Sequence, residues 1–370
     1  MRYVGVMSGT SVDGLDIALV DISTDMAPGA PRIVESTTVA LPDALAAAVV
    51  ALNSPGDDEI DRAGTCDAAL GEFIGQSVLG CLEHWNIPPG DIRAIGCHGQ
   101  TIRHRPDSTP PFTMQIGDPN RVAEVTGIDT VADLRRRDMA AGGEGAPLAP
   151  LFHDALFRDA ERHRVVINVG GIANATILPA ASDSIVGFDT GPGNALLDAW
   201  SRHCRGEPYD RGGAWAAQGK VAPKLMAALA HDGFVMRAPP KSTGKELYNL
   251  DYVIRMATPF DHPPEDVQAT LLEFTAWSIA TAVERWGPGT GDVVVCGGGR
   301  HNDALMKRLA ANLPGYGILR SDDLNVDGDG LEAAAFAWFA HRTLTGQPSN
   351  VPAVTGAKGP RVLGAVYPAG

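Results

Sequence analysis

The stretch RYVGVMSGTSVDGLDIALVDI, residues 2–22, opens the chain with two apolar runs on either side of a glycine-rich turn. Residues 2–7 and 15–22 are rich in strand-forming side chains, so the stretch predicts a hairpin. A second stretch, VVINVGGIANATIL at residues 165–178, has the same order of strand, glycine turn and strand. The recurrence indicates an internal duplication, and the alternative is that two unrelated hairpins happen to look alike.

Chain length and composition predict a globular protein of two α/β domains. The 370 residues exceed the size at which one core usually keeps growing, and 44% of them are hydrophobic and 20% charged. We expect a first domain at 1–130, joined by the tail 345–370, and a second at 131–344. Apolar patterns predict further strands at 32–41, 184–188 and 292–296, and helices at 43–52, 58–85, 194–203, 220–231, 264–286, 301–312 and 330–343.

Charge and cysteine content exclude several classes of partner. Thirty basic and 44 acidic residues leave a net charge of -14, which disfavours nucleic acid and anionic membranes. The five cysteines contain no C-x-x-C pair, so a reducing compartment is expected rather than disulfides or zinc. The N-terminus lacks the features of a secretory signal, and the apolar stretches are too short to span a bilayer. We therefore expect a cytoplasmic protein that binds neither nucleic acid nor membranes.

Two glycine-rich turns are candidates for binding a nucleotide. In residues 8–14, glycines allow close approach of phosphates, and the hydroxyls and amides of Thr10 and Ser11 are suitable donors. Gly297-Gly298-Gly299 follows a predicted strand and precedes a predicted helix, which suits a nucleotide at bare backbone. Neither turn matches the P-loop or the dinucleotide fingerprint. An ordinary structural turn is the alternative reading of both.

The segment Gly187–Asn194 carries the best candidate for a general base. It places Asp189 at a strand end, beside glycines and the start of a helix. Capping of that helix is the alternative role. The segments 97–101 and 135–137 add hydrogen-bonding and cationic groups suited to hydroxyls, a carboxylate or phosphates. We expect one or two of the three arginines to face a site.

Eight motifs occur in the order typical of one family, and with them the chain resembles the anhydro-N-acetylmuramic acid kinases. They are GVMSGTSVDGLDIALV, CHGQTIRH, MQIGDPNRVA, AAGGEGAPLAPLFH, NVGGIAN, GFDTGPGNALLD, PPKSTGKELYN and CGGGRHN. The resemblance implies the sugar-kinase, Hsp70 and actin fold, in which two α/β domains of duplicated actin-like, ribonuclease H-like topology hold ATP in the cleft between them. Glu144 stands where we expect the family to have glutamine.

The resemblance also implies roles for individual residues. Asp189 matches the family's catalytic aspartate. The expected ATP-binding residues are Gly9, Thr10, Ser11, Val12, Asp13, Gly14, Leu15, Asp16, Gly170, Gly171, Asn174, Gly297, Gly298 and Gly299. The expected substrate contacts are His98, Thr101, Arg135 and Glu332, and the candidate Mg²⁺ ligands are Asp13 and Asp16.

The activity that the resemblance implies depends on ATP and Mg²⁺. Such an enzyme opens the 1,6-anhydro ring of 1,6-anhydro-N-acetylmuramic acid with water and phosphorylates the released oxygen, giving N-acetylmuramic acid 6-phosphate in cell-wall recycling. A homodimer is expected. A simple hexose or amino-sugar kinase that uses Asp189 on a free hydroxyl is the first alternative, and an actin-like or Hsp70-like ATPase is the second. A dinucleotide-dependent oxidoreductase is disfavoured because its fingerprint is missing.

Overall fold

The computed structural model describes residues 1–9, 12, 14–22, 31–244 and 246–370 of the chain. Thr10, Ser11 and Asp13, which we expected to bind ATP or magnesium, lie outside these residues. Within the described part, none of the helices combines the length and the apolar character needed to cross a bilayer.

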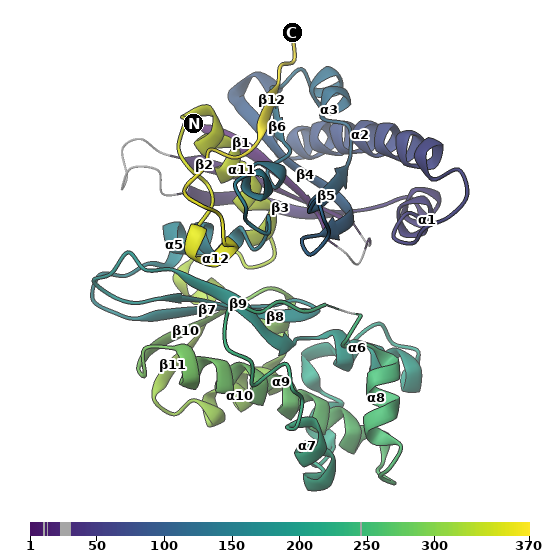
Figure 1. Cartoon of the computed structure of the whole chain (residues 1–370), viewed down its shortest axis with the longest axis vertical. Coiled ribbons are helices and arrows are strands. Elements are labelled where there is room, and N and C mark those ends of the chain that lie inside the picture. The colour runs from purple at the N-terminus through teal and green to yellow at the C-terminus, as the bar shows by residue number, and fades with distance from the viewer. Residues whose placement is uncertain (10–11, 13, 23–30, 245) are drawn as a thin grey trace. The chain divides into compact units, whose positions relative to one another are not determined.

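The chain forms two compact units (Figure 1). Unit 1 comprises Met1–Leu156 together with Asp329–Gly370, and unit 2 comprises Phe157–Gly328. Compared with the domains expected from sequence, residues 131–156 and the helix near 331–344 lie with unit 1. The packing of that helix, described below, accounts for its placement.

Unit 1 is built on a seven-stranded sheet with the order β12-β6-β4-β1-β2-β3, and β5 pairs with β4. The strands are β1 Arg2–Ser8, β2 Gly14–Ile22, β3 Pro31–Ala40, β4 Ile92–Arg105, β5 Phe112–Ile116, β6 Thr130–Ala132 and β12 Ala365–Tyr367. The helices are α1 Asp43–Ala51, α2 Glu59–His84, α3 Pro119–Thr126, α4 Arg136–Ala140, α5 Ala149–Phe157, α11 Leu331–Leu344 and α12 Pro352–Thr355, with a short 3₁₀ turn at Pro89–Asp91. The C-terminal strand β12 pairs antiparallel with β6, so the tail belongs to this sheet.

Unit 2 is built on a five-stranded sheet with the order β11-β10-β7-β8-β9. The strands are β7 Arg164–Val169, β8 Ile172–Leu178, β9 Val186–Pro192, β10 Gly291–Cys296 and β11 Tyr316–Arg320. The helices are α6 Ala195–Arg205, α7 Pro223–Leu229, α8 Leu250–Ala257, α9 Pro264–Trp286 and α10 Asp303–Asn312. Short 3₁₀ turns occur at Arg211–Gly213, Ala216–Gln218, Gly298–His301 and Ser321–Leu324. Buried α9 packs against β8 and β9.

Five strands of the first sheet have the same topology as the five strands of the second, which confirms the duplication expected from the two hairpins. In unit 1, β3 pairs antiparallel with β2 and β2 pairs antiparallel with β1, and β4 and β6 continue parallel to β1. In unit 2, β9, β8 and β7 are likewise antiparallel, and β10 and β11 continue parallel to β7. Each unit is therefore one copy of the actin-like, ribonuclease H-like sheet.

Helix α11 lies directly on the sheet of unit 1, against β1, β2 and β4 (Figure 1). Gly5 of β1 and Gly96 of β4 are partners in register, and they make this close approach possible. A Cβ atom on Gly5 would come within 1.8 Å of the Ala333 carbonyl oxygen, and one on Gly96 within 1.9 Å of that of Phe336. The apolar first ten residues of α11 are buried there, apart from exposed Glu332, so burial assigns the helix to unit 1.

Candidate active site

Asp189 lies in the middle of β9, paired with Asn174 of β8. Its carboxylate oxygen Oδ2 accepts hydrogen bonds from the Ser242 hydroxyl at 3.1 Å and from the Thr243 backbone N–H at 2.9 Å. Its own N–H donates to the Lys241 carbonyl at 3.1 Å. Helix α6 begins after Asn194, which occupies the N-cap position, so Asp189 does not cap that helix.

The surroundings of Asp189 favour a carboxylate that can take up a proton. Burial raises its pKa above the ordinary aspartate value, and the hydrogen bonds from Thr243 and Ser242 oppose this rise. Among the described residues, no donor meets the other oxygen, Oδ1. One oxygen is thus held in place while the other is available to a reactant, which is the geometry that a general base requires.

The Gly170-Gly171 turn connects β7 to β8 and supports the start of α6. The Gly171 carbonyl accepts the N–H groups of Gly193 at 2.9 Å and Ala195 at 3.0 Å, and the Gly170 carbonyl accepts that of Asn194 at 2.8 Å. A Cβ on Gly193 would lie 2.3 Å from the Gly170 oxygen, so the two backbones touch. The structure therefore brings this turn to the junction between β9, the strand that carries Asp189, and helix α6.

The Gly297-Gly298-Gly299 turn follows β10, and its three glycines have different surroundings. Gly297 has φ 72°, and a Cβ there would lie 2.2 Å from the Asn168 side-chain oxygen. A Cβ on Gly299 would lie 2.3 Å from Val169. These two glycines allow the turn to pack on β7, whereas Gly298 has open space around its Cα. Gly298 is exposed, so its backbone is open to a ligand.

Gly298 lines a pocket of about 540 Å³ in unit 2. Its other lining residues come from α6, from the loop after α6 and from the start of α10: Asn194, Leu197, Asp198, Tyr209, Asp210, Arg211, Gly212, His301 and Asn302. Buried Asp210 fixes the loop by accepting the backbone N–H groups of Trp215 and Ala216, each at 2.9 Å. The volume is within the usual range for small-molecule sites. We did not single out residues 209–212 from the sequence, because no recognisable pattern marks them.

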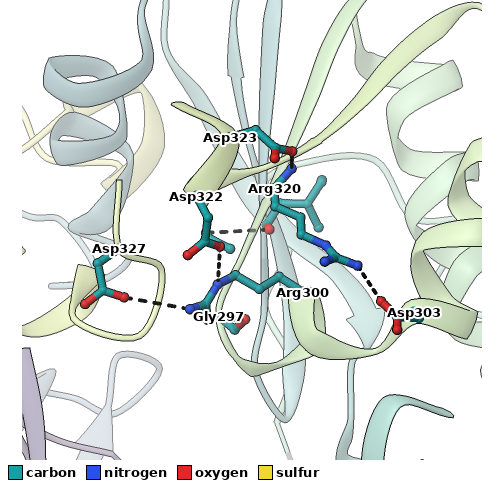
Figure 2. Close-up of polar contacts among 9 residues, drawn as sticks. Gly297, Arg300, Asp303, Arg320, Asp322, Asp323 and Asp327 are labelled. Atoms are coloured by element: carbon teal, nitrogen blue, oxygen red, sulfur yellow. Dashed lines mark hydrogen bonds and ion pairs between the residues drawn. The ribbon is translucent and has the colours of Figure 1, made fainter. Parts of the chain in front are cut away.

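Arg300 holds the Gly297 turn in place through hydrogen bonds and ion pairs (Figure 2). Its side chain is only 3% exposed, and its Nε donates to Asp322 at 2.7 Å. Its Nη1 donates to the Gly297 carbonyl at 3.2 Å, and its Nη2 lies 3.7 Å from an Asp327 carboxylate oxygen. A planar guanidinium can satisfy all three acceptors at once, which makes arginine suited to this position. This role was not recognised in the sequence, although Arg300 directly follows the glycines.

The described part of the opening turn is held by polar contacts within unit 1. The Ser8 hydroxyl contacts the Gln100 side-chain oxygen at 2.6 Å and the Gly14 carbonyl at 3.2 Å. Val12 has φ 57°, and its N–H donates to the Gly9 carbonyl at 3.1 Å. The next residues, Leu15 and Asp16, lie in β2.

Leu15 and Asp16 differ in what they offer a ligand. The Leu15 side chain is buried in the core of unit 1, so only its backbone is available. Asp16 accepts a hydrogen bond from Thr38 at 2.6 Å through Oδ1. In the described part of the chain, no three acidic, histidine or cysteine side chains are grouped to hold a metal ion.

Buried His98 and half-buried Arg135 form a hydrogen-bonded pair in unit 1. Arg135 Nε donates to His98 Nε2 at 2.9 Å, and Arg135 Nη1 donates to the Gly145 carbonyl at 2.9 Å. His98 Nδ1 lies 2.9 Å from the Gly99 carbonyl, and only an N–H on Nδ1 satisfies both contacts. Burial and Arg135 lower the pKa of His98, which keeps the ring neutral. Both ring nitrogens are thus engaged, and a contact between His98 and a sugar stays a prediction.

Arg135 is the one of the three neighbouring arginines that is not exposed. Burial lowers its pKa to about 10, and the negative charge of Glu332 opposes this change. The Phe336 ring lies 4.7 Å from the His98 ring. Thr101 is half-buried on β4 and accepts a hydrogen bond from Gln115 at 3.0 Å. Arg135 and His98 are thus brought together in unit 1, and Glu332 lies on α11, the helix whose Phe336 packs on His98.

The loop that supplies the Gly145 carbonyl is held by a buried aspartate. Asp138 accepts the Gly145 N–H at 2.8 Å through Oδ2. Its Oδ1 accepts Asn350 at 2.6 Å and Thr355 at 2.8 Å, both from the C-terminal tail. The tail therefore supports the loop behind Arg135, a role that no local sequence pattern reveals.

The fold and these sites together define a class of protein. A duplicated sheet of this order, with a carboxylate on one strand and a strand, glycine turn and helix beside a ligand-sized pocket, is an arrangement shared by the sugar kinases and the ATPases with an actin-like fold. The family described as "Anhydro-N-acetylmuramic acid kinase" matches residues 1–369. The chain belongs to this family.

Individual relatives agree with the family match. A protein from Shewanella putrefaciens is 48% identical over 368 residues, covering 99% of this chain and 98% of the relative. One from Pseudomonas syringae pv. tomato is 49% identical over 370 residues, covering 99% of each chain. Both are named anhydro-N-acetylmuramic acid kinase. A solved ROK family glucokinase from Streptomyces griseus aligns with 91% of this chain and 98% of its own, at 14% identity and a TM-score of 0.39.

Proposed function

We propose that this protein uses ATP and water to convert 1,6-anhydro-N-acetylmuramic acid into N-acetylmuramic acid 6-phosphate. The family to which the chain belongs supports the substrate and the kinase activity. The observation that carries the mechanism is the carboxylate of Asp189, which is held through Oδ2, with a pKa raised by burial. This matches a base that must take a proton near neutral pH.

The reaction couples ring opening to phosphoryl transfer. Asp189 takes a proton from a water molecule, whose oxygen attacks the anomeric carbon while the bond from that carbon to the bridging oxygen breaks. The released oxygen on carbon six attacks the γ-phosphorus, and ADP leaves. One carboxylate suffices, because the negative charge that develops on the departing oxygen goes into the new phosphate ester instead of being neutralised by a general acid.

The pocket beside Gly298 is the proposed site for the adenosine part of ATP. Its volume of about 540 Å³ and its place at the start of α10 support this assignment. Within the same unit we assign phosphate contacts to Gly170, Gly171 and Asn174. In support, Asn174 pairs with Asp189 in the sheet, and the two glycines contact the backbone at the end of the same strand, β9. In unit 1 the remaining proposed ATP contacts are Gly9, Thr10, Ser11, Val12, Asp13, Gly14, Leu15 and Asp16.

A magnesium ion fits the proposed reaction and the available donors. Mg²⁺ is commonly bound through one or two carboxylates together with substrate phosphates and water, so a preformed cluster of ligands is not required. Asp16, whose carboxylate is on the strand after the opening turn, and Asp13 are the proposed protein ligands. When bound, the ion supplies positive charge that neutralises the phosphates.

The proposed sugar contacts are in unit 1. Arg135 is held by two hydrogen bonds and suits the carboxylate of a muramic acid, because a guanidinium binds carboxylates through paired donors. Thr101, Glu332 and His98 complete the proposed set. We further propose a homodimer in the cytoplasm, and the five free cysteines, four of them buried, are compatible with a reducing compartment.

An assay of ADP release tests this function. The wild type with magnesium and ATP should turn over 1,6-anhydro-N-acetylmuramic acid, and it should not turn over reducing N-acetylmuramic acid at a comparable rate. Asp189→Asn should lower kcat by about 10²- to 10⁴-fold. Preference for the reducing sugar would favour a simple amino-sugar kinase, and sugar-independent ADP release together with polymerisation would favour an actin-like ATPase.

A further inference from the structure

We propose that the Lys241–Thr243 segment is a positioning element for Asp189 and that the buried side chain of Lys241 is its anchor. The segment makes three hydrogen bonds to Asp189, from or to three consecutive residues. This inference rests on the proposed role of Asp189 as the general base. It adds to that role the residues that decide which carboxylate oxygen faces the reacting water.

Lys241 is buried without a direct carboxylate partner among the described residues. It is 6% exposed, and its ammonium group donates to the carbonyls of Phe234 at 3.2 Å and Val235 at 2.8 Å. It also lies 4.8 Å from the centroid of the Phe234 ring and 5.8 Å from that of Phe188. Two carbonyls and two ring faces stabilise the cation and hold the lysine side chain in one position.

Phe234 and Val235, whose carbonyls accept the Lys241 ammonium group, are themselves held in place by Asp232. The carboxylate of Asp232 accepts the N–H groups of Phe234 at 2.9 Å and Val235 at 3.4 Å. It also accepts the hydroxyls of Tyr248 and Tyr252, each at 3.0 Å. The anchor of Lys241 is therefore a network of buried aromatic side chains around the half-buried carboxylate of Asp232.

The segment next to this anchor determines the orientation of Asp189. The Lys241 carbonyl accepts the Asp189 N–H, and the following two residues supply both donors to Oδ2. With Oδ2 engaged, Oδ1 is the oxygen that receives the proton. Displacing a reacting group by about 1 Å costs on the order of 10²-fold in rate, so an anchor for this segment has a direct effect on turnover.

The same segment influences the charge state of Asp189. The hydrogen bonds from Thr243 and Ser242 and the positive charge of Lys241 lower the pKa of Asp189, while burial and Glu246 raise it. Arg237, Arg285 and Asp232 act in turn on Lys241, whose pKa burial lowers to about 8. Loss of the Ser242 hydroxyl or of the Lys241 charge therefore moves the acidic limb of the pH–rate profile to higher pH.

The test compares pH–rate profiles of matched variants of the full-length enzyme. Ser242→Ala removes one donor, and Ser242→Thr restores a hydroxyl. Lys241→Met removes the anchor, and Lys224→Met removes an exposed lysine from α7 of the same unit as a control. If Lys241→Met does not fold, Lys241→Gln tests the charge alone: its amide can still donate to the carbonyls, so the acidic limb should move to higher pH while kcat falls less.

We expect Lys241→Met to lower kcat by about 10²-fold and Ser242→Ala by about threefold to tenfold. In both variants the acidic limb should move to higher pH, Ser242→Thr should restore the wild-type profile, and Lys224→Met should match the wild type. An unchanged acidic limb in Lys241→Met and Ser242→Ala would overturn the inference even if kcat falls. An active Asp189→Asn would instead overturn the proposed function.

Discussion

Replacing Gly96 with alanine should destabilise unit 1, because α11 lies directly on this residue. A Cβ at this position would meet the Phe336 carbonyl oxygen at 1.9 Å. Restoring an ordinary separation of ~3.5 Å requires the helix to retreat by about 1.6 Å. Overpacking of this kind costs about 1 to 3 kcal/mol, and we expect the upper end, because the contact is with helix backbone that cannot change rotamer.

Thermal unfolding followed by circular dichroism measures this effect, and Gly80 supplies a control of opposite sign. Gly80 is an exposed glycine in α2, and a Cβ there would meet nothing within 4 Å. Gly80→Ala should stabilise the helix by roughly 0.5 to 1 kcal/mol. Gly96→Ala should lower Tm by several degrees, at about 2 to 4 °C per kcal/mol.

The retreat of α11 should also affect sugar binding, since Phe336 lies on the His98 ring and Glu332 is on the same helix. The KM for the sugar should rise in Gly96→Ala while the KM for ATP changes less. A Gly96→Ala variant that melts at or above the wild-type temperature would refute the packing of α11 on β4.

Four further outcomes follow from the site. Arg300→Met should raise the KM for ATP about tenfold, with the sugar KM nearly unchanged, because the glycine turn loses a charged donor. Arg308→Met, at an exposed position of α10, is the control in the same steady-state assay. His98→Phe should lower kcat/KM for the sugar by roughly tenfold, since Arg135 loses an acceptor while ring packing is kept, and an unchanged value would contradict the pairing. Since burial raises the pKa of Asp189 and a base acts only when deprotonated, kcat/KM should fall as pH decreases through a pKa above the ordinary aspartate value; an acidic limb at that ordinary value would contradict the argument. Chelation of Mg²⁺ with EDTA should abolish ADP release and added Mg²⁺ should restore it, and full activity in EDTA would remove the metal from the mechanism.

Local patterns predicted the strands and helices that begin and end within one continuous apolar run. The opening hairpin was expected at 2–7 and 15–22 and occurs at Arg2–Ser8 and Gly14–Ile22. The helix expected at 264–286 is α9, Pro264–Trp286. These elements follow from residue type and periodicity alone, which is why their limits agree closely with the structure.

Placement of elements in space depends on contacts that sequence spacing does not contain. The helix at 331–344 was assigned to the second half by its position in the chain, but its apolar surface is buried on β1 and β4 through Gly5 and Gly96. Each glycine is ordinary in its own strand, and only their pairing in register explains them.

In the candidate site, too, local sequence patterns identified one residue, but they did not reveal its tertiary contacts. Asp189 was identified from its own segment, whereas the hydrogen-bonding groups that hold it come from residues 241–243, far along the chain. Their sequence, KST, lies within a motif that the resemblance singled out, but nothing in it indicates which residue it contacts. The burial of Lys241 and the guanidinium contacts of Arg300 likewise depend on tertiary structure.

The mass of the product tests the central claim most directly. Wild-type enzyme is incubated with magnesium, ATP and 1,6-anhydro-N-acetylmuramic acid, and the product is analysed by mass spectrometry beside Asp189→Asn. We predict one product, heavier than the substrate by a water molecule and a phosphoryl group, that forms in step with ADP and is lost in the variant. A phosphorylated product that retains the anhydro bridge, or equal product formation by Asp189→Asn, would contradict coupled ring opening and phosphorylation through Asp189.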